Sequence, residues 1–393
     1  MDFRRLEDAK LKGKTAIIRV DFNVPRNKDG DITDDTRIQS ALPTIKLMQS
    51  VGVKSVLLSH FGRPKGQPDP DLSLRFIVTA LAEALGSEVM FLPDLNPNAA
   101  ALMKAGDVML LENTRFHAGE TVGDNELAKA FAEFGDIFIM DAFSAAHRNH
   151  ASSAGVAKYL PAFAGLAMER ELDHISQALD VPKKPVMGVV GGAKVSSKID
   201  LLKNLVSKLD TLVIGGGMAN TFLYAQGHNV GASLCETDLK DTALEIIANA
   251  KKAKCEIILP VDIVAAEKFA ANAPHRVCGL GEVKKDEMIL DAGPDTITKI
   301  MDAMEASQTL IWNGPLGAFE MSPFDTSTVE AAKYAAKLTK SGKLISVAGG
   351  GDTVAALNHA NAADDFTFIS TAGGAFLEWM EGKPLPGVNI LKK

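Results

Sequence analysis

Short apolar runs alternate with longer amphipathic segments along almost the whole chain. The apolar runs lie at 15–20, 53–59, 88–92, 107–112, 136–141, 185–190, 211–215, 255–260, 309–313, 343–348 and 366–370. They are continuously apolar rather than alternating, which is typical of parallel strands covered on both faces. Helical periodicity characterises the segments between them, at 36–51, 73–86, 124–134, 196–209, 217–226, 238–252, 325–340 and 352–360. The pattern predicts repeated βα units and an α/β fold with two doubly wound parallel sheets.

The division into domains rests on length and on one further helical segment. A chain of 393 residues is long enough for two domains of ordinary size. Residues 165–181 have helical periodicity and are followed by Pro182, and we interpret them as a helix that joins the domains. The expected boundaries are therefore 1–168 for the first domain and 169–377 for the second.

Composition and charge exclude several classes of protein. With 42 Lys and Arg against 49 Asp and Glu, the net charge is −7, which argues against a nucleic-acid binder. No run approaches 18 consecutive apolar residues, so we expect no membrane-spanning helix, and the opening MDFRRLEDAKLKG does not resemble a signal peptide. Three cysteines without a CxxC motif disfavour a disulfide framework or a zinc site, and we expect a cytoplasmic protein.

Ten of the 33 glycines gather in four clusters in the second half of the chain, at 191–192, 215–217, 349–351 and 373–374. Three of the clusters directly follow a predicted strand and open a predicted helix, and the fourth comes two residues after a strand. This places them at the carboxyl edge of a parallel sheet, where ligands bind in open α/β folds. Glycine lets the backbone approach an anion, and a helix N-terminus offers free N–H groups. A tight turn alone explains one cluster, whereas four together indicate a polyphosphate ligand.

Two common phosphate-binding motifs do not fit these positions. Gly13-Lys14-Thr15 has the ending of a P-loop, but Asp8 stands where that motif needs its first glycine. The GxGxxG fingerprint fails at 215–217, because its last position is Asn220. The sequence therefore supports neither a P-loop NTPase nor a Rossmann dehydrogenase.

Charged side chains accompany the glycine clusters. Lys194 and Lys198 lie at the start of the helix after Gly191–Gly192, where a cation is unfavourable unless an anion is near. These lysines are either phosphate ligands or a solvated surface pair. Asp352 is either a first-turn acid of its helix or an oxygen ligand for Mg²⁺, which prefers one or two carboxylates together with phosphates. Glu320 is either a ribose ligand or an exposed loop acid.

A basic set follows the predicted strands of the first half. It comprises Arg37, His60, Arg63, Arg115 and Arg148, with Asp21 and Asn23 at the end of the first strand. Arginine suits bidentate recognition of carboxylate and phosphate. Strand ends converge at one edge of a sheet, so the set predicts a pocket for a small, strongly anionic substrate. The alternatives are unrelated surface ion pairs and, for His60, a structural hydrogen bond.

No Ser-His-Asp spacing, HExxH motif or pair of catalytic carboxylates stands out in the sequence. This fits phosphoryl transfer to or from a carboxylate, which is already ionised at pH 7 and needs no general base. Catalysis would then rest on positioning and on cations that neutralise the transferring group.

The whole chain resembles the phosphoglycerate kinases. The motifs that carry the resemblance stand in the family's order and spacing: RVDFNVP, HFGRP, ENTRF, DAFSAAHRNHAS, GGAKVSSKI, GGGMANTF, WNGPLGAFE, AGGGDT and STAGGA. The resemblance implies two α/β/α, Rossmann-like domains joined by a hinge helix, with a C-terminal tail of about 378–393 returning to the first. It implies a monomeric glycolytic and gluconeogenic kinase that transfers a phosphoryl group in line, with hinge closure, from 1,3-bisphosphoglycerate to ADP, giving 3-phosphoglycerate and ATP.

The resemblance also implies roles for single residues. The acidic metabolite would be bound in the first domain by Asp21, Asn23, Arg37, His60, Phe61, Gly62, Arg63, Arg115 and Arg148. Arg37 and Lys194 would stabilise the transferring phosphoryl group. The nucleotide would be bound in the second domain by Lys198, Gly215, Gly216, Gly217, Asn313, Pro315, Glu320, Gly349, Gly350, Gly351, Asp352 and Thr353. Asp352 would be the carboxylate that holds Mg²⁺.

Two departures from the family pattern and three rival functions bear on this hypothesis. Phe61 replaces a leucine, and Ala372 replaces a glycine, which matters if that position needs a positive φ. The rivals are a kinase for another small carboxylate, a nucleotide-binding regulator without catalysis, and a dehydrogenase. The complete basic set argues against the first. Retention of Arg37, Lys194 and Asp352 argues against the second, and the failed GxGxxG against the third.

Overall fold

The computed structural model describes residues 2–393, which divide into two compact units. Unit 1 comprises the chain up to Asp173 together with Pro384–Lys393, and unit 2 comprises His174–Lys383. The boundary falls inside helix α5 (Leu166–Leu179), five residues beyond the expected 168.

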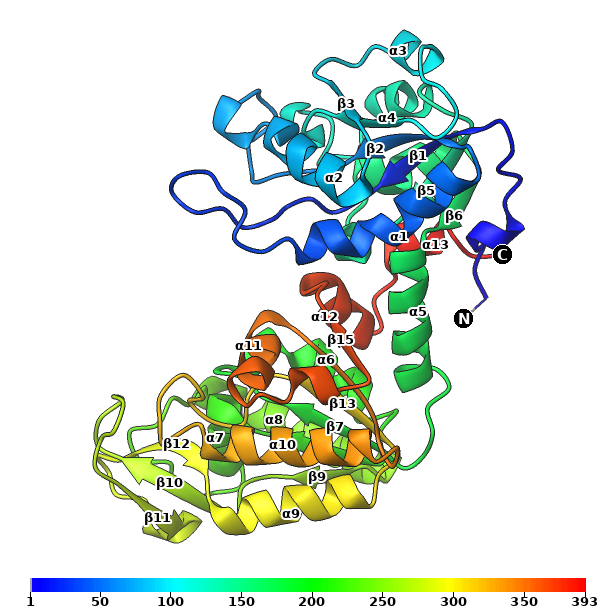
Figure 1. Ribbon diagram of the computed structural model, residues 1–393. Helices are drawn as coiled ribbons and strands as arrows, with labels where there is room; N and C mark the ends of the chain where they lie inside the picture. The colour runs from blue at the N-terminus through cyan, green and yellow to red at the C-terminus, as the bar shows by residue number, and fades with distance from the viewer. Residues whose placement is uncertain (1) are drawn as a thin grey trace. The chain divides into compact units, whose positions relative to one another are not determined.

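Unit 1 is built on a six-stranded parallel sheet in the order β3-β4-β2-β1-β5-β6 (Figure 1). The strands are β1 (Thr15–Arg19), β2 (Lys54–Leu58), β3 (Val89–Leu92), β4 (Val108–Leu111), β5 (Ile137–Met140) and β6 (Ala162–Ala164). Five match the predicted apolar runs, and β6 is an addition of three residues. Because Arg19 stands opposite both Leu58 and Met140, the segments that follow β1, β2 and β5 leave the sheet at one edge.

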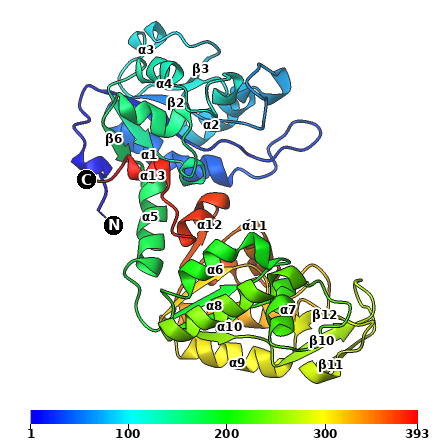
Figure 2. The same ribbon diagram turned by 180° about the vertical axis from the view of Figure 1, so that it is seen from behind.

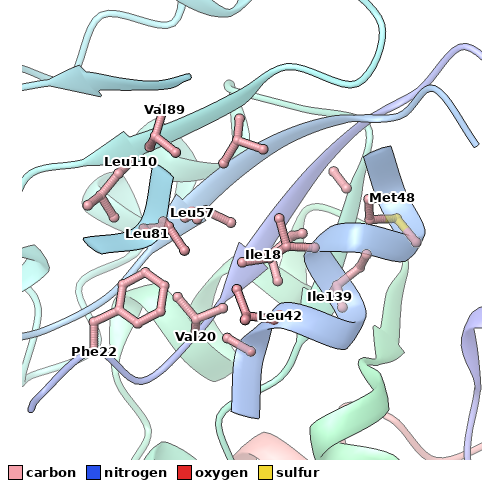
Figure 3. Packing of buried hydrophobic residues seen from close by; sticks show 14 of the residues in the cluster. Ile18, Val20, Phe22, Leu42, Met48, Leu57, Leu81, Val89, Leu110 and Ile139 are labelled. Atoms are coloured by element: carbon pink, nitrogen blue, oxygen red, sulfur yellow. The ribbon is translucent and has the colours of Figure 1, made fainter. Parts of the chain in front are cut away.

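The helices of unit 1 cover the sheet with apolar faces. They are α1 (Thr36–Ser50), α2 (Ile77–Leu85), α3 (Asn98–Ala101), α4 (Asn125–Ala132) and α13 (Pro386–Asn389). Leu42 and Met48 of α1 and Leu81 of α2 pack on Ile18 and Leu57 of the strands (Figure 3). The Asp124 side chain accepts a hydrogen bond from Leu127 N at 2.8 Å and so caps the start of α4. The helices α1, α2 and α4 match predicted segments, whereas α3 and α13 are short additions.

Unit 2 contains a second six-stranded parallel sheet, in the order β15-β14-β13-β7-β8-β9. Its strands are β7 (Val186–Val190), β8 (Thr211–Ile214), β9 (Glu256–Ile258), β13 (Thr309–Asn313), β14 (Ile345–Gly349) and β15 (Phe368–Ser370). All six coincide with predicted runs. The neighbours β7 and β13 end level with each other, since Asn313 stands opposite Val190.

The helices of unit 2 form layers on both faces of its sheet. They are α6 (Ile199–Leu205), α7 (Gly216–Ala225), α8 (Lys240–Ala253), α9 (Pro294–Glu305), α10 (Thr326–Lys340), α11 (Gly351–His359) and α12 (Gly374–Met380). In Figure 1, α10 lies beside α9, and Figure 2 shows α8 beside α6 and α7 on the other face.

Unit 2 also carries an antiparallel sheet that the sequence pattern did not predict. Its order is β11-β10-β12, with β10 (Asp262–Ala266), β11 (His275–Gly279) and β12 (Met288–Ala292). Pro260 separates β9 from β10, so one apolar stretch of sequence serves two different sheets.

The C-terminal segment divides between the units. Gly387 N donates to Ala146 O at 2.8 Å and Arg4 N donates to Leu391 O at 2.8 Å, which ties the last residues into unit 1. Residues 378–383, however, belong to unit 2, where Met380 O accepts from Asn204 Nδ2 at 2.5 Å. The tail of unit 1 thus begins at Pro384, six residues after the expected position. Within residues 2–393, no helix is both long and apolar enough to cross a membrane.

Candidate active site

The candidate residues of unit 1 lie at the carboxyl edge of its sheet, and Asp21 is the first of them. Its Oδ2 accepts hydrogen bonds from Arg37 Nη1 and, at 2.5 Å, from Ser144 Oγ, while Asn23 N donates to its Oδ1 at 3.0 Å. Burial works against the charged form of Asp21, but the Arg37 cation and these donors hold the pKa of its carboxyl below the usual value. Asp21 is therefore a carboxylate that orients Arg37 at the start of α1.

His60 follows β2 and is 9% exposed. Its Nδ1 lies 3.1 Å from Nη2 of Arg19, the last residue of β1. Burial, and next the charge of Arg19, lower the pKa of His60 well below 6.5. The imidazole is consequently neutral at physiological pH.

The loop after His60 is fixed by its neighbours. Phe61 packs on Phe76 with ring centroids 4.9 Å apart, so an aromatic ring fills this position without disturbing the core. Gly62 has φ +59°, and an added Cβ would come within 2.7 Å of Leu72 Cδ2. Asn23 Oδ1 accepts from Gly62 N at 3.0 Å, which joins the loop to the segment after β1.

Three further arginines complete the basic set. Arg115 donates from Nη1 to Gly62 O at 2.7 Å, and its buried Nε has no hydrogen-bond partner within residues 2–393. Burial, followed by the charges of Arg148 and Arg19, lowers the pKa of Arg115. Arg148 and Arg63 are exposed, and Arg148 Nε donates to His147 Nε2 at 2.9 Å. These cations repel one another, so the cluster is suited to an anion.

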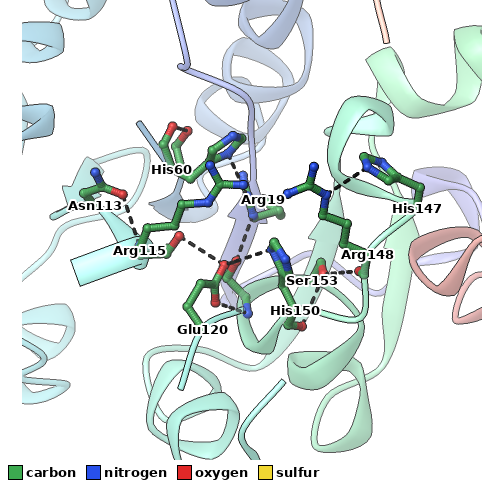
Figure 4. A network of polar contacts seen from close by, with 12 residues as sticks. Arg19, His60, Asn113, Arg115, Glu120, His147, Arg148, His150 and Ser153 are labelled. Atoms are coloured by element: carbon green, nitrogen blue, oxygen red, sulfur yellow. Dashed lines mark hydrogen bonds and ion pairs between the residues drawn. The ribbon is translucent and has the colours of Figure 1, made fainter. Parts of the chain in front are cut away.

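A buried polar network, which the sequence reasoning missed, lies behind the basic set (Figure 4). Arg19 and Glu120 are both fully buried, and Ser152 Oγ bridges them at 3.0 Å from Arg19 Nε and 2.5 Å from Glu120 Oε1. His150 Nδ1 lies 3.7 Å from the same carboxylate oxygen. The available signal was an arginine inside the otherwise apolar run TAIIRV.

In unit 2, the strand ends carry the glycine clusters as the pattern predicts. An added Cβ at Gly191 would lie 1.7 Å from Pro315 O. The segments after β7 and β13 are therefore so close that only glycine fits at position 191. Asn313 is 5% exposed, and its Nδ2 donates to Gly349 O at 2.8 Å. Asn313 therefore joins the ends of β7, β13 and β14, because its backbone O also accepts from Gly191 N at 3.0 Å, and Pro315 lies close to Gly191.

Lys198 occupies the space between these strand ends. Its Nζ donates to Gly191 O and Asn313 Oδ1, both at 2.6 Å, and to Asn313 O at 3.1 Å. Burial lowers the pKa of Lys198 to about 8, and the charge of Asp352 partly opposes this effect. Lys194, by contrast, is exposed. The two lysines thus differ: one is held by neutral carbonyl oxygens, and the other is available to solvent.

The other two loops also expose backbone at helix starts. Gly216 opens α7 with φ +65°, and an added Cβ would lie 2.8 Å from Gly192 O; Gly215 and Gly217 are similarly crowded, by Leu316 and Ala193. Gly350 has φ +101° just before α11. Thr353 Oγ1 accepts from Gly314 N at 2.7 Å, so α11 is fixed to the segment after β13.

Two acids and one substitution complete the picture of unit 2. Glu320 and Asp352 are exposed, and Asp352 lies in the first turn of α11. Within residues 2–393 no three His, Cys, Asp or Glu side chains gather as a ready metal site. Gly373 has φ +54°, whereas Ala372 is not among the residues of positive φ. The Cβ of Ala372 thus causes no backbone strain at this position.

The chain matches the family model described as "Phosphoglycerate kinase" over residues 6–383. It is 59% identical to a phosphoglycerate kinase of Caulobacter vibrioides and 57% identical to one of Sinorhizobium medicae, with all of both proteins covered. Among solved structures, it is similar to phosphoglycerate kinase from Coxiella burnetii, with a TM-score of 0.93 and 42% identity, covering 99% of this chain and 98% of that one. The Pyrococcus horikoshii enzyme gives a TM-score of 0.75 and 29% identity over the same shares.

Proposed function

The chain belongs to the phosphoglycerate kinase family, and from this premise we propose that it transfers a phosphoryl group reversibly between 1,3-bisphosphoglycerate and ADP, giving 3-phosphoglycerate and ATP. The observation that supports the proposal for this chain is a pair of cationic or amide-rich sheet edges, each suited to an anion. One gathers guanidinium groups at the sheet edge of unit 1, and the other gathers backbone amides and Lys198 at the sheet edge of unit 2.

Unit 1 is the proposed binding domain for the acidic metabolite. Its ligands would be Asp21, Asn23, Arg37, His60, Phe61, Gly62, Arg63, Arg115 and Arg148. The support is that Asp21 orients Arg37, and that Asn23 and Arg115 fix the loop carrying Gly62. A phosphate and a carboxylate on one small molecule suit several guanidinium groups held at fixed positions.

Unit 2 is the proposed nucleotide-binding domain. The phosphates would lie against the helix starts formed by Gly215–Gly217 and Gly349–Gly351, with Lys198 and Thr353 beside them. Asn313, Pro315 and Glu320 would line the nucleoside. Lys198 already lies at the ends of β7 and β13. Burial lowers its pKa, and a phosphate beside it would stabilise the charged form.

Magnesium is part of the proposal through Asp352. An exposed carboxylate at a helix start beside phosphate-binding amides provides the hard oxygen ligand that Mg²⁺ takes in addition to phosphate oxygens. The ion would neutralise charge on the nucleotide phosphates, while the chain's own cations act on the transferring group.

The chemistry needs positioning more than acid–base catalysis. In the forward direction a β-phosphate oxygen of ADP attacks phosphorus in line, and the bond from phosphorus to the acyl oxygen breaks, releasing an ionised carboxylate. No proton has to move at that oxygen. Arg37 and Lys194 would neutralise charge on the phosphoryl group, and closure of the two units about α5 would bring the substrates together and exclude water.

The direct test is a coupled assay with ATP, Mg²⁺ and 3-phosphoglycerate. We expect turnover with this substrate and none with glycerate, acetate or aspartate, because the basic set demands a phosphate as well as a carboxylate. Turnover only with another carboxylate would identify a different kinase on this fold, and no turnover would leave a nucleotide-binding protein. We also propose that the enzyme works as a monomer in the cytoplasm, which size-exclusion chromatography and cell fractionation test.

A further inference from the structure

The buried network behind the basic set has a fixed direction of hydrogen bonding. Arginine has only N–H donors and ionised glutamate only acceptors. Arg19 Nε therefore donates to Ser152 Oγ, and the single hydroxyl proton of Ser152 goes to Glu120 Oε1. The charge of Arg19 is thus balanced through the serine by a carboxylate that is itself fully buried.

The other end of the Arg19 guanidinium determines the state of His60. Nη1 donates to Val20 O, and Nη2 contacts His60 Nδ1 at 3.1 Å. Because Nη2 can only donate, Nδ1 must be the bare nitrogen, and the proton of the neutral ring must lie on Nε2. The charged groups that act on His60 are Arg19, Asp21, Arg37 and Arg115. Its Nε2–H is then a fixed hydrogen-bond donor.

Glu120 is held by two separate parts of unit 1. Ser152 N donates to Oε2 at 2.9 Å from the segment after β5, and Thr114 Oγ1 donates to Oε1 at 3.2 Å from the loop after β4. The same two segments carry Arg148 and Arg115. Glu120 is therefore placed to set the position of Arg19 relative to the loops that present the basic set.

We propose that Glu120 and Ser152 are positioning residues, which hold Arg19 so that His60 keeps its proton on Nε2 and offers it to the acidic substrate. The inference rests on the proposed function in that His60 is taken to contact this substrate. Glu120 and Ser152 are both fully buried, and their link to His60 runs through Arg19 (Figure 4).

The chain supplies a matched control for the test. Ser152 and Ser153 are adjacent, fully buried serines of the same helical turn, Ala151–Gly155. Ser153 Oγ donates to Arg148 O at 3.1 Å and to His150 O at 3.2 Å, outside the chain of bonds to Arg19. Ser152→Ala and Ser153→Ala each delete one buried hydroxyl, but only the first removes the link between Arg19 and Glu120.

The primary readout is the tautomer of His60 in ¹⁵N-histidine-labelled protein by NMR, with the signal of His60 assigned from a His60→Gln variant. The wild type and Ser153→Ala should show a neutral ring with bare Nδ1, and Ser152→Ala should show a mixture of tautomers. The KM for 3-phosphoglycerate should rise roughly tenfold in Ser152→Ala, with the KM for ATP within about twofold, because a donor to an anion is lost.

The outcomes separate the inference from the proposed function. If Ser152→Ala folds and His60 keeps its proton on Nε2, the positioning role is wrong. If the tautomer changes while the KM for 3-phosphoglycerate does not, the positioning role stands and the contact between His60 and substrate is wrong. Should Ser152→Ala fail to fold, Glu120→Gln decides by the same signal: an unchanged tautomer in that variant contradicts the role of Glu120.

Discussion

Gly351→Ala separates the binding role of the third glycine cluster from its structural role. Gly351 is the first residue of α11, is exposed, and lacks the positive φ of its neighbour Gly350. An added Cβ would meet no atom within 4 Å in the described chain. The fold therefore does not need glycine at this position, and a need for it would come from a ligand.

The magnitudes follow from these facts. Alanine is better than glycine in a helix by about 0.5–1 kcal/mol, so the free energy of unfolding should be unchanged or rise by up to that amount. If nucleotide phosphate lies against the start of α11, the Cβ would keep it from the amide donors. A lost hydrogen bond to a charged group costs about 1.5–3 kcal/mol, which is roughly a ten- to hundredfold increase in the KM for ATP.

Gly281→Ala is the matched control, because Gly281 also lies in unit 2, lacks a positive φ and has open space around an added Cβ. Urea denaturation and steady-state kinetics with ATP and with 3-phosphoglycerate would be measured for both variants. The control should match the wild type in both KM values. A stable Gly351→Ala enzyme with an unchanged KM for ATP would show that this glycine does not approach the nucleotide.

Three other substitutions test the remaining assignments. Arg37→Ala should lower kcat by several orders of magnitude while the KM for ATP and the melting temperature stay near normal, since Arg37 is partly exposed and its ion pair is with Asp21. An unchanged kcat would contradict its role. Lys198 has a pKa of about 8, below its unfolded value of 10.5. Between these two values the unfolded state binds more protons than the folded state, so the free energy of unfolding should increase as the pH rises from about 8 to 10.5. Denaturation of Lys198→Met at pH 7.5 and 10 should lack this gain, and its KM for ATP should be raised at pH 7. Asp141 is buried with a pKa of about 7, above its unfolded 3.8, so the folded state binds more protons and stability is lost as pH rises from about 4 to 7. At pH 5 the free energy of unfolding of Asp141→Asn should be equal to or lower than that of the wild type, and at pH 8 the variant should be relatively more stable than at pH 5. A stability difference that does not change with pH would contradict the titration of Asp141.

Most of the two parallel sheets could be predicted from the sequence, because a buried parallel strand has a continuous apolar run as its signature. The start of α1 was also predicted correctly, because the helix begins at Thr36 as expected. The antiparallel sheet of unit 2 was missed because β11 is exposed at two of its five positions and buried at only one, so it offers no such run. Helix α9 was overlooked although Pro294 at its first turn is an ordinary start signal.

The candidate site likewise has one part that the sequence indicated and one part that it did not. Charged residues just after strands could be found, since topology alone brings strand ends to one edge. Arg19 and Glu120 could not be assigned, because burial of a charge depends on a partner: Arg19 bonds Ser152, which is 133 residues away in the chain. The state of His60 also follows from that contact and not from any local pattern.

Under the proposed function, the two units would hold anions in different ways. In unit 1 two cations are balanced by carboxylates, Arg37 directly by Asp21 and Arg19 through Ser152 by Glu120. In unit 2 the cation Lys198 is surrounded by uncharged carbonyl oxygens, and its pKa falls accordingly. A substrate anion in unit 1 would meet Arg37 already bonded to Asp21 and would relieve the repulsion between Arg115 and Arg148. In unit 2 it would add negative charge beside Lys198. Neither arrangement shows in the net charge of −7, because what matters is which charges share an edge of a sheet.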